Sequence, residues 1–118
     1  MTAGPAACLP GYVCVISRRH GEEPNELDDG GAWWTECMVV ARALSAELRP
    51  TKMNYEIHGN TVRHLYLHLF PRMDDVPFVG RPIDGTAHLF TRSSAELARL
   101  RDAISTAARR YGIPTAGV

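Results

Sequence analysis

The chain lacks the features that would indicate a membrane, a secretory route or a nucleic acid. None of its apolar runs approaches the roughly 20 residues that a membrane-spanning helix needs. Its first residues, Met1 to Pro5, lack the charged and then apolar layout of a secretion signal. Its 13 basic residues balance its 13 acidic ones, so no excess charge favours binding to nucleic acid or to a membrane surface. We therefore expect a cytoplasmic protein with neither kind of partner.

Cysteine is scarce as well, and its spacing does not indicate a metal. The chain has three cysteines, Cys8, Cys14 and Cys37, which is an odd number without the close pairs that zinc sites use. We expect them to be buried free thiols, as is common in a reducing compartment. The sequence predicts neither a metal nor another cofactor.

Length and composition fit one globular domain. The 118 residues are 45% hydrophobic and 22% charged, which is close to the globular average. Because a chain of this length builds a single core, we expect one domain over residues 1–118.

Periodicity and turn residues predict an α+β domain. Strands are expected where β-branched and apolar residues follow turn signals, and helices where apolar residues recur at steps of three and four. The predicted strands span 11–17, 53–57 and 62–70, a short helical turn lies near 26–27, and the helices span 32–48 and 93–111. Residues 73–85 are expected to be irregular, and 87–90 are too short to assign. Tight turns between strands favour an antiparallel sheet of about five strands covered by two main helices.

Both helices have an apolar stripe that predicts their buried faces. The stripe of the first helix consists of Trp34, Cys37, Met38, Ala41, Leu44 and Leu48. Ser93 and Glu96 have the spacing of a capping box and predict the start of the second helix. Its stripe consists of Leu97, Leu100, Ile104 and Ala107 or Ala108.

The most informative segment alternates polar rings with leucine. His64, Tyr66 and His68 occupy every second position from 64 to 68, with Leu65 and Leu67 between them. Successive side chains of a strand point to opposite faces. The pattern therefore predicts a polar row on one face of a core strand and a leucine row on the other.

Three interpretations of the polar row are open from the residues alone. It can be an ordinary exposed strand face, or a metal site, or a binding surface. The two imidazoles are four residues apart, so their backbones lie about 13 Å apart in a strand, which argues against a shared metal ion. The turn Gly59-Asn60-Thr61 just upstream offers backbone N–H groups, an amide and a hydroxyl, and Arg72 adds a guanidinium. These donors suit phosphate oxygens.

The segment 64–70 resembles the signature of the histidine-triad (HIT) family, in which three histidines alternate with apolar residues. The resemblance, to the nucleotide hydrolase branch, extends over 52–75 and over 10–20, where Pro-Gly leads through a strand to a histidine. It implies a HIT-like fold, a purine nucleotide or dinucleoside polyphosphate as substrate, and attack on the α-phosphate without a catalytic metal. It also implies a homodimer.

The resemblance assigns a role to each matching residue. His64 is expected to hold the site together by hydrogen bonds, and His68 to contact phosphate oxygens. Thr61 is expected near the scissile phosphate and the leaving group. Asn54 is expected to orient the phosphate, and His20 to lie near the phosphates at the end of the earlier strand. No role is implied for two further histidines, His58 and His88.

Tyr66 stands where the family has its nucleophilic histidine. A neutral imidazole has a lone pair near neutral pH, whereas a phenol is protonated there and needs a base or a cation to attack. The favoured hypothesis is a HIT-like phosphohydrolase or nucleotidyltransferase whose activity is altered by Tyr66. The alternatives are an inactive nucleotide-binding or regulatory protein, and a structural homodimer without a ligand.

Overall fold

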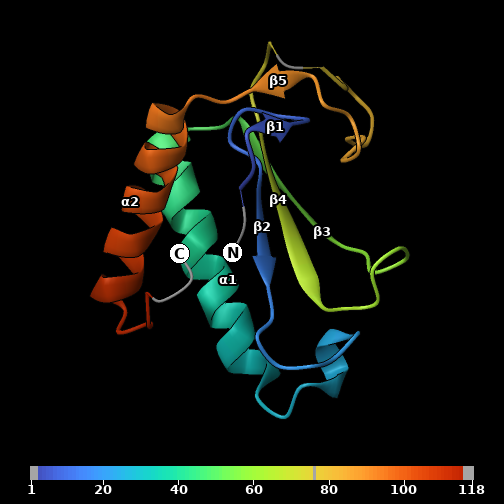
Figure 1. Ribbon diagram of the computed structural model, residues 1–118, viewed down its shortest axis with the longest axis vertical. Helices are drawn as coiled ribbons and strands as arrows, with labels where there is room; N and C mark the ends of the chain where they lie inside the picture. Colours follow the sequence, from blue (N-terminus) through green and yellow to red (C-terminus); the bar gives the residue numbers. More distant parts are fainter. Residues whose placement is uncertain (1–2, 76, 116–118) are drawn as a thin grey trace.

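The computed structural model describes residues 3–75 and 77–115. Its elements are β1 (Ala6–Ala7), β2 (Val13–Ile16), a single 3-10 turn η1 (Pro24–Glu26), α1 (Gly30–Leu48), β3 (Lys52–Ile57), β4 (Tyr66–Arg72), β5 (Phe90–Thr91) and α2 (Ser94–Arg110). Both helices pack on one side of the strands (Figure 1). The predicted α+β class with two main helices is confirmed.

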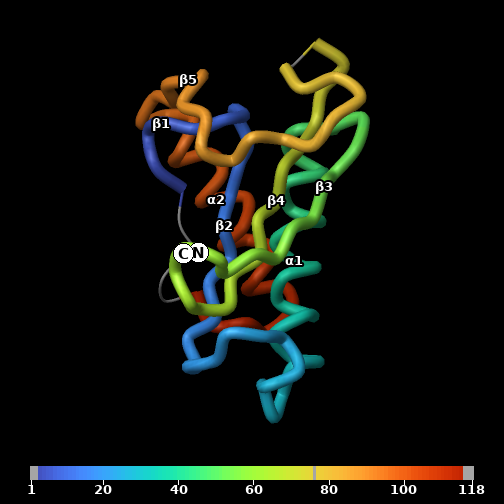
Figure 2. Tube along the Cα trace, turned by 90° about the vertical axis from the view of Figure 1, so that its right-hand side faces the viewer, coloured from blue at the N-terminus to red at the C-terminus, as the bar shows by residue number. Residues whose placement is uncertain are grey.

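The strands are divided between two antiparallel sheets instead of forming one. Strand β4 lies in the middle of a three-stranded sheet of order β2-β4-β3. The short strands β1 and β5 pair with each other across one end of the molecule (Figure 2). Each has two residues, so neither produces an apolar periodicity that a sequence pattern can reveal.

Strand β4 starts later than the sequence predicts, at position 66 instead of 62. The reason lies in the backbone hydrogen bonds of the preceding residues. His64 N–H donates to the Val62 carbonyl in a turn, and Leu65 N–H donates to the Gly21 carbonyl. Leu65 therefore pairs with the chain after β2 and His64 closes a turn, so the ladder between β3 and β4 stops at Leu67.

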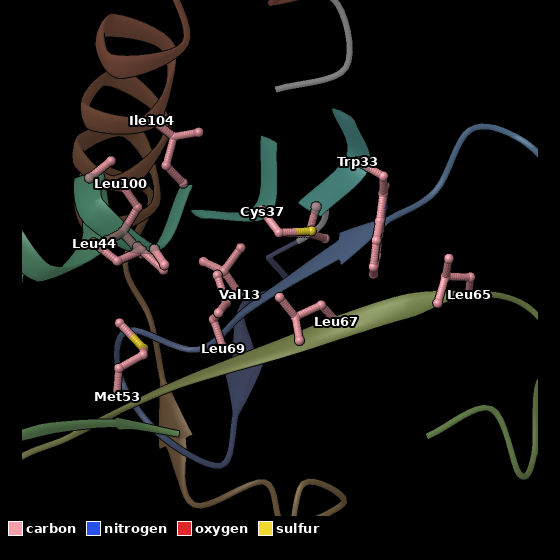
Figure 3. Packing of buried hydrophobic residues seen from close by; sticks show 13 residues of the cluster. Val13, Trp33, Cys37, Leu44, Met53, Leu65, Leu67, Leu69, Leu100 and Ile104 are labelled. Atoms are coloured by element: carbon pink, nitrogen blue, oxygen red, sulfur yellow. The ribbon is translucent and has the colours of Figure 1, made fainter. Parts of the chain in front are cut away.

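The core lies between β4 and the two helices. Leu65, Leu67 and Leu69 are almost fully buried, with exposed fractions of 0%, 1% and 0%. They face side chains of α1 and α2, among them Cys37 and Ile104 (Figure 3). The leucine half of the predicted alternation is therefore confirmed, which directs the intervening side chains of β4 to the opposite face.

Helix α1 buries Trp33, not Trp34, and this corrects the predicted stripe. Trp34 is 45% exposed and Trp33 only 8%. Both tryptophans fit the spacing to Cys37, at four and three residues, so the periodicity could not choose between them. The helix starts at Gly30 with Asp29 as its N-cap and ends before Arg49, whose backbone is left-handed.

Helix α2 begins as predicted. The Ser93 side chain accepts a hydrogen bond from Glu96 N–H, and the Glu96 carboxylate accepts one from Ser93 N–H. Leu100, Ile104 and Ala108 are the buried residues of this helix.

All three cysteines are buried free thiols, as predicted. Within the described part of the chain, neither helix combines the length and apolarity needed to cross a membrane.

Candidate phosphate-binding site

Tyr66 and His68 project from β4 onto the face of the sheet that the helices leave uncovered. The strand register sets Cys14 of β2 and Glu56 of β3 directly opposite His68. Because opposed residues share a face, this surface has a thiol, an imidazole and a carboxylate in one row across three strands. Tyr66 and His68 meet edge to face, with ring centroids 5.0 Å apart.

His68 has a hydrogen-bond partner and several aromatic neighbours on this face. Its Nδ1 lies 2.7 Å from the Tyr12 hydroxyl oxygen. Its ring stacks on Tyr12 and on Phe70, at centroid distances of 5.8 and 5.7 Å. The His58 ring lies 5.6 Å away. Burial lowers the pKa of His68, nearby His58 lowers it further, and Glu56 opposes the shift. The imidazole is therefore neutral at neutral pH.

His64 lies just before β4 and is anchored to the chain after β2. Its Nε2 is 2.8 Å from the carbonyl oxygen of buried Ser17. Since a carbonyl only accepts hydrogen bonds, Nε2 donates and Nδ1 remains to accept. The His20 ring lies 6.3 Å from the His64 ring. The structure thus brings His20, His64 and Ser17 together, and the role of His64 in a catalytic site stays a prediction.

The turn Gly59-Asn60-Thr61 is part of the connection between β3 and β4. This connection lies at the end of the sheet where β4 begins, at Tyr66 (Figure 1). Gly59 has a φ of +102°, which disfavours any residue with a side chain. Asn60 and Thr61 are exposed. Their polar groups are accessible to a ligand from solvent, and their contact with phosphate stays a prediction.

Asn54 and Arg72 lie at the other end of the same face. An Arg72 amino group donates to the Asn54 side-chain oxygen at 3.0 Å and to the Arg81 carbonyl at 2.9 Å, and its second amino group donates to the Phe78 carbonyl. Arg72 therefore fastens the segment after β4 to the sheet. Phosphate binding by Arg72 and by Asn54 stays a prediction. Because the Asn54 side-chain oxygen already accepts from Arg72, Asn54 would bind phosphate through its amide nitrogen.

Tyr12, Glu56 and His58 belong to this face, although the sequence did not select them as site residues. Tyr12 contacts His68 directly, and the Glu56 carboxylate lies 2.8 Å from His58 Nε2. Glu56 and His58 are two residues apart around the end of β3, which is a visible signal that they share a face. Tyr12 gives no such signal, because its contact depends on the register between β2 and β4.

A cleft adjoins the Asn54 end of this face. It has a volume of about 630 Å³, and its lining includes Lys52, Asn54, Glu56, Arg72 and Arg81. A separate cavity of about 350 Å³ lies beyond β2, between Trp33 and the end of α2. No group of three or more histidine, cysteine, aspartate or glutamate side chains in residues 3–75 and 77–115 has an arrangement that could hold a metal ion.

The solved structures most similar to this chain include several histidine triad proteins. One from Bradyrhizobium japonicum is 26% identical, with a TM-score of 0.74 over 85% of this chain and 79% of the other. One from Marinobacter aquaeolei is 20% identical, with a TM-score of 0.71 over 84% and 74%. A hypothetical histidine triad nucleotide-binding protein from Sulfolobus tokodaii is 17% identical, with a TM-score of 0.64 over 92% and 79%.

The similarity lies in the fold and is weak in the sequence. The chain matches no protein-family model, and no curated protein sequence matches it significantly. The structural matches show that the chain has the histidine-triad fold.

Proposed function

We propose that this chain, which has the histidine-triad fold, binds the phosphates of a purine nucleoside phosphate or dinucleotide on the face that carries Tyr66 and His68. The observation that carries the proposal is the environment of His68. Its imidazole is neutral, is held in place by Tyr12 and Phe70, and lies on an uncovered face of the sheet. A fixed neutral imidazole is suited to donate a hydrogen bond to a phosphate oxygen.

The neighbouring groups support the same ligand class. Asn60 and Thr61 are exposed at one end of the face, and the cleft at its other end is lined by Lys52 and Arg81 among others. The description of the Sulfolobus tokodaii protein as nucleotide-binding agrees with this assignment.

The favoured reaction is attack on the α-phosphate by Tyr66. The phenolic oxygen would form a bond to phosphorus, the bond from phosphorus to the leaving phosphate oxygen would break, and the phenolic proton would pass to a base. Water would then attack the phosphorus, the bond from phosphorus to the tyrosine oxygen would break, and a proton lost by the water would restore the phenol. An aryl phosphate ester is more persistent than a phosphorylated imidazole, so we expect slow turnover and an accumulating covalent intermediate.

The second candidate is a protein that binds nucleotide without chemistry. One observation favours it: among the described residues, the Tyr66 hydroxyl makes no hydrogen bond to a side chain that could act as its base. In this case the face would serve nucleotide-dependent regulation.

Incubation with mass-tagged adenosine nucleotides distinguishes the two candidates. A covalent adduct on Tyr66, or turnover that Tyr66→Phe abolishes, supports the enzyme. Binding without adduct or turnover, weakened by His68→Ala, supports the binding protein. Absence of nucleotide binding would contradict both and leave a structural protein.

Tyr66→His is the most decisive variant. If the rest of the site is competent, restoring imidazole at this position should create hydrolase activity.

We also propose that the protein is a homodimer and that it is located in the cytoplasm. Sedimentation tests the first and cell fractionation the second.

A further inference from the structure

Packing on one side and hydrogen bonds on the other restrain Tyr12 on the His68 face. Its ring stacks on Phe70 with centroids 5.0 Å apart and planes inclined by 14°. Phe70 is 1% exposed and packs with Cys8, Leu9 and Ile83 in a second apolar cluster, against which Tyr12 also packs. The Tyr12 ring therefore has little freedom to rotate away from His68.

The backbone of Tyr12 is fixed as well. Arg92 is 4% exposed, and one of its amino groups donates to the Tyr12 carbonyl at 2.6 Å and to the Pro10 carbonyl at 3.2 Å. The same guanidinium donates to the Gly4 carbonyl at 2.9 Å through Nε. Because ring and backbone are both restrained, the position of the Tyr12 hydroxyl is set before any ligand arrives.

The hydrogen bond between Tyr12 and His68 joins two neutral groups. Burial raises the pKa of the Tyr12 phenol, with Cys14 and Cys8 contributing in the same direction. Burial lowers the pKa of His68. The phenol therefore keeps its proton and the imidazole carries only one.

The direction of this hydrogen bond follows from the available acceptors. Burial raises the pKa of the nearby Cys14 thiol to about 11, so the sulfur stays protonated. A thiol sulfur is a weak acceptor, whereas a neutral imidazole nitrogen is a good one. The phenol proton therefore points to His68 Nδ1, the side-chain atom that lies within hydrogen-bond distance of the Tyr12 hydroxyl.

We propose that Tyr12 is a positioning residue that fixes the tautomer of His68, so that Nδ1 accepts from the Tyr12 hydroxyl and Nε2 carries the proton. The two ring nitrogens then have separate roles. Nδ1 is committed to the protein, and Nε2–H makes no hydrogen bond among the described residues, so it can donate to a ligand oxygen.

This assignment limits what His68 can do in the proposed reaction. An imidazole with Nδ1 occupied and Nε2 protonated can donate a hydrogen bond to a phosphate oxygen but cannot take the proton of Tyr66. A base for Tyr66 would have to be another group. This consequence rests on the proposed function, whereas the tautomer itself does not.

Long-range proton–nitrogen NMR spectra of isotope-labelled protein test the tautomer without any ligand. In the wild-type protein above neutral pH we expect His68 to be protonated at Nε2 alone. The Nδ1 resonance should then differ from that of an unprotonated imidazole nitrogen without a hydrogen bond, because Nδ1 accepts one. A spectrum with the proton on Nδ1 would overturn the proposal, and this measurement needs no variant.

Tyr12→Phe tests the role of the hydroxyl while keeping the stacked ring. Loss of the hydrogen bond to the neutral imidazole should make His68 bind a proton about three- to tenfold more tightly, and the Nδ1 resonance should move toward that of an unbonded imidazole. Tyr111→Phe is the matched control, since Tyr111 is 53% exposed and lies at the C-terminal end of α2. Unchanged His68 resonances in Tyr12→Phe would refute the proposal.

Binding of adenosine monophosphate separates this proposal from the proposed function. We expect Tyr12→Phe to weaken binding severalfold and to shift its pH profile toward higher pH, while Tyr111→Phe has no effect on the profile. If the NMR result holds but the wild-type protein binds no nucleotide, the proposed function fails and the role of Tyr12 stands. If nucleotide binds but Nδ1 carries the proton, the role of Tyr12 fails.

Discussion

The guanidinium group of Arg72 and the side-chain oxygen of Asn54 are joined by a hydrogen bond of 3.0 Å. The bond links the end of β4 to β3 on the His68 face. Arg72 also donates to the Phe78 and Arg81 carbonyls, so one side chain holds the segment after β4 against the sheet. A planar guanidinium can serve several acceptors in this way, and an ammonium group cannot reproduce its geometry.

Arg72→Lys should therefore loosen the segment 77–82 without unfolding the domain. Within this segment the Arg81 N–H donates to the Phe78 carbonyl. If the variant loses roughly 1.4 kcal/mol of local stability, hydrogen exchange at the Arg81 amide should accelerate by about tenfold. Exchange followed by mass spectrometry measures this. Arg63→Lys is the control, because its ion pair with Glu22 is on the surface. Equal exchange in both variants would contradict the role of Arg72.

The lowered pKa of His68 predicts how stability depends on pH. A histidine whose pKa is lower in the folded than in the unfolded chain binds fewer protons when folded. Its stabilising contribution is present above the unfolded pKa, about 6.5, and is lost as pH falls through the folded pKa. The titratable groups that face His68 are Tyr12, Cys14, Glu56 and His58; of these, His58 lowers its pKa and Glu56 opposes the shift.

Urea unfolding at about pH 7.5 and about pH 5 tests this dependence. The wild-type protein should lose more stability on acidification than His68→Gln, whose side chain does not titrate. An equal loss would show that His68 is not the group responsible. His88→Gln, at an exposed position, should behave as the wild-type protein.

The sequence predicted those elements whose signals are local. The capping box of Ser93 and Glu96 depends on residues three apart, and the antiparallel pairing of β3 with β4 depends on the short connection between them. The alternation of leucine with polar rings in β4 was also sufficient to place Leu67 and His68 on opposite faces. Each of these features is determined within one or two elements.

The sequence did not predict features that depend on distant pairing. Tyr12 contacts His68 across 56 positions, through a strand register that local periodicity does not determine. The pairing of β1 with β5 also joins opposite ends of the chain. Trp33 was missed for a different reason, since two adjacent tryptophans fit the same stripe and only packing decided between them.

Arg92→Met is expected to be among the most destabilising single substitutions. It would leave the Gly4, Pro10 and Tyr12 carbonyls without the donors of the buried Arg92 guanidinium. Loss of several hydrogen bonds from one charged donor should cost about 3 kcal/mol of unfolding free energy. Arg99→Met provides the control, since Arg99 is exposed and its ion pair with Glu47 should be worth at most about 1 kcal/mol. Similar losses in the two variants would count against a special role for Arg92.

Two glycine-to-alanine substitutions test whether Gly11 is required by packing. A Cβ on Gly11 would lie 2.2 Å from Leu48 Cδ1 and 2.7 Å from Pro71 Cγ. The leucine can change rotamer, but the proline ring is fixed in the buried middle of the sheet, so Gly11→Ala should cost about 1–3 kcal/mol as an overpacked site does. A Cβ on Gly31, in the first turn of α1, would meet nothing within 4 Å.

Gly31→Ala should therefore leave stability unchanged or raise it by up to about 1 kcal/mol, because alanine favours the helical backbone. Urea unfolding of both variants gives the comparison. If Gly11→Ala is as stable as Gly31→Ala, the chain beside Tyr12 can shift to admit a methyl group. In that case His68 resonances should move in Gly11→Ala as well, because displacement of Tyr12 would alter its hydrogen bond to Nδ1.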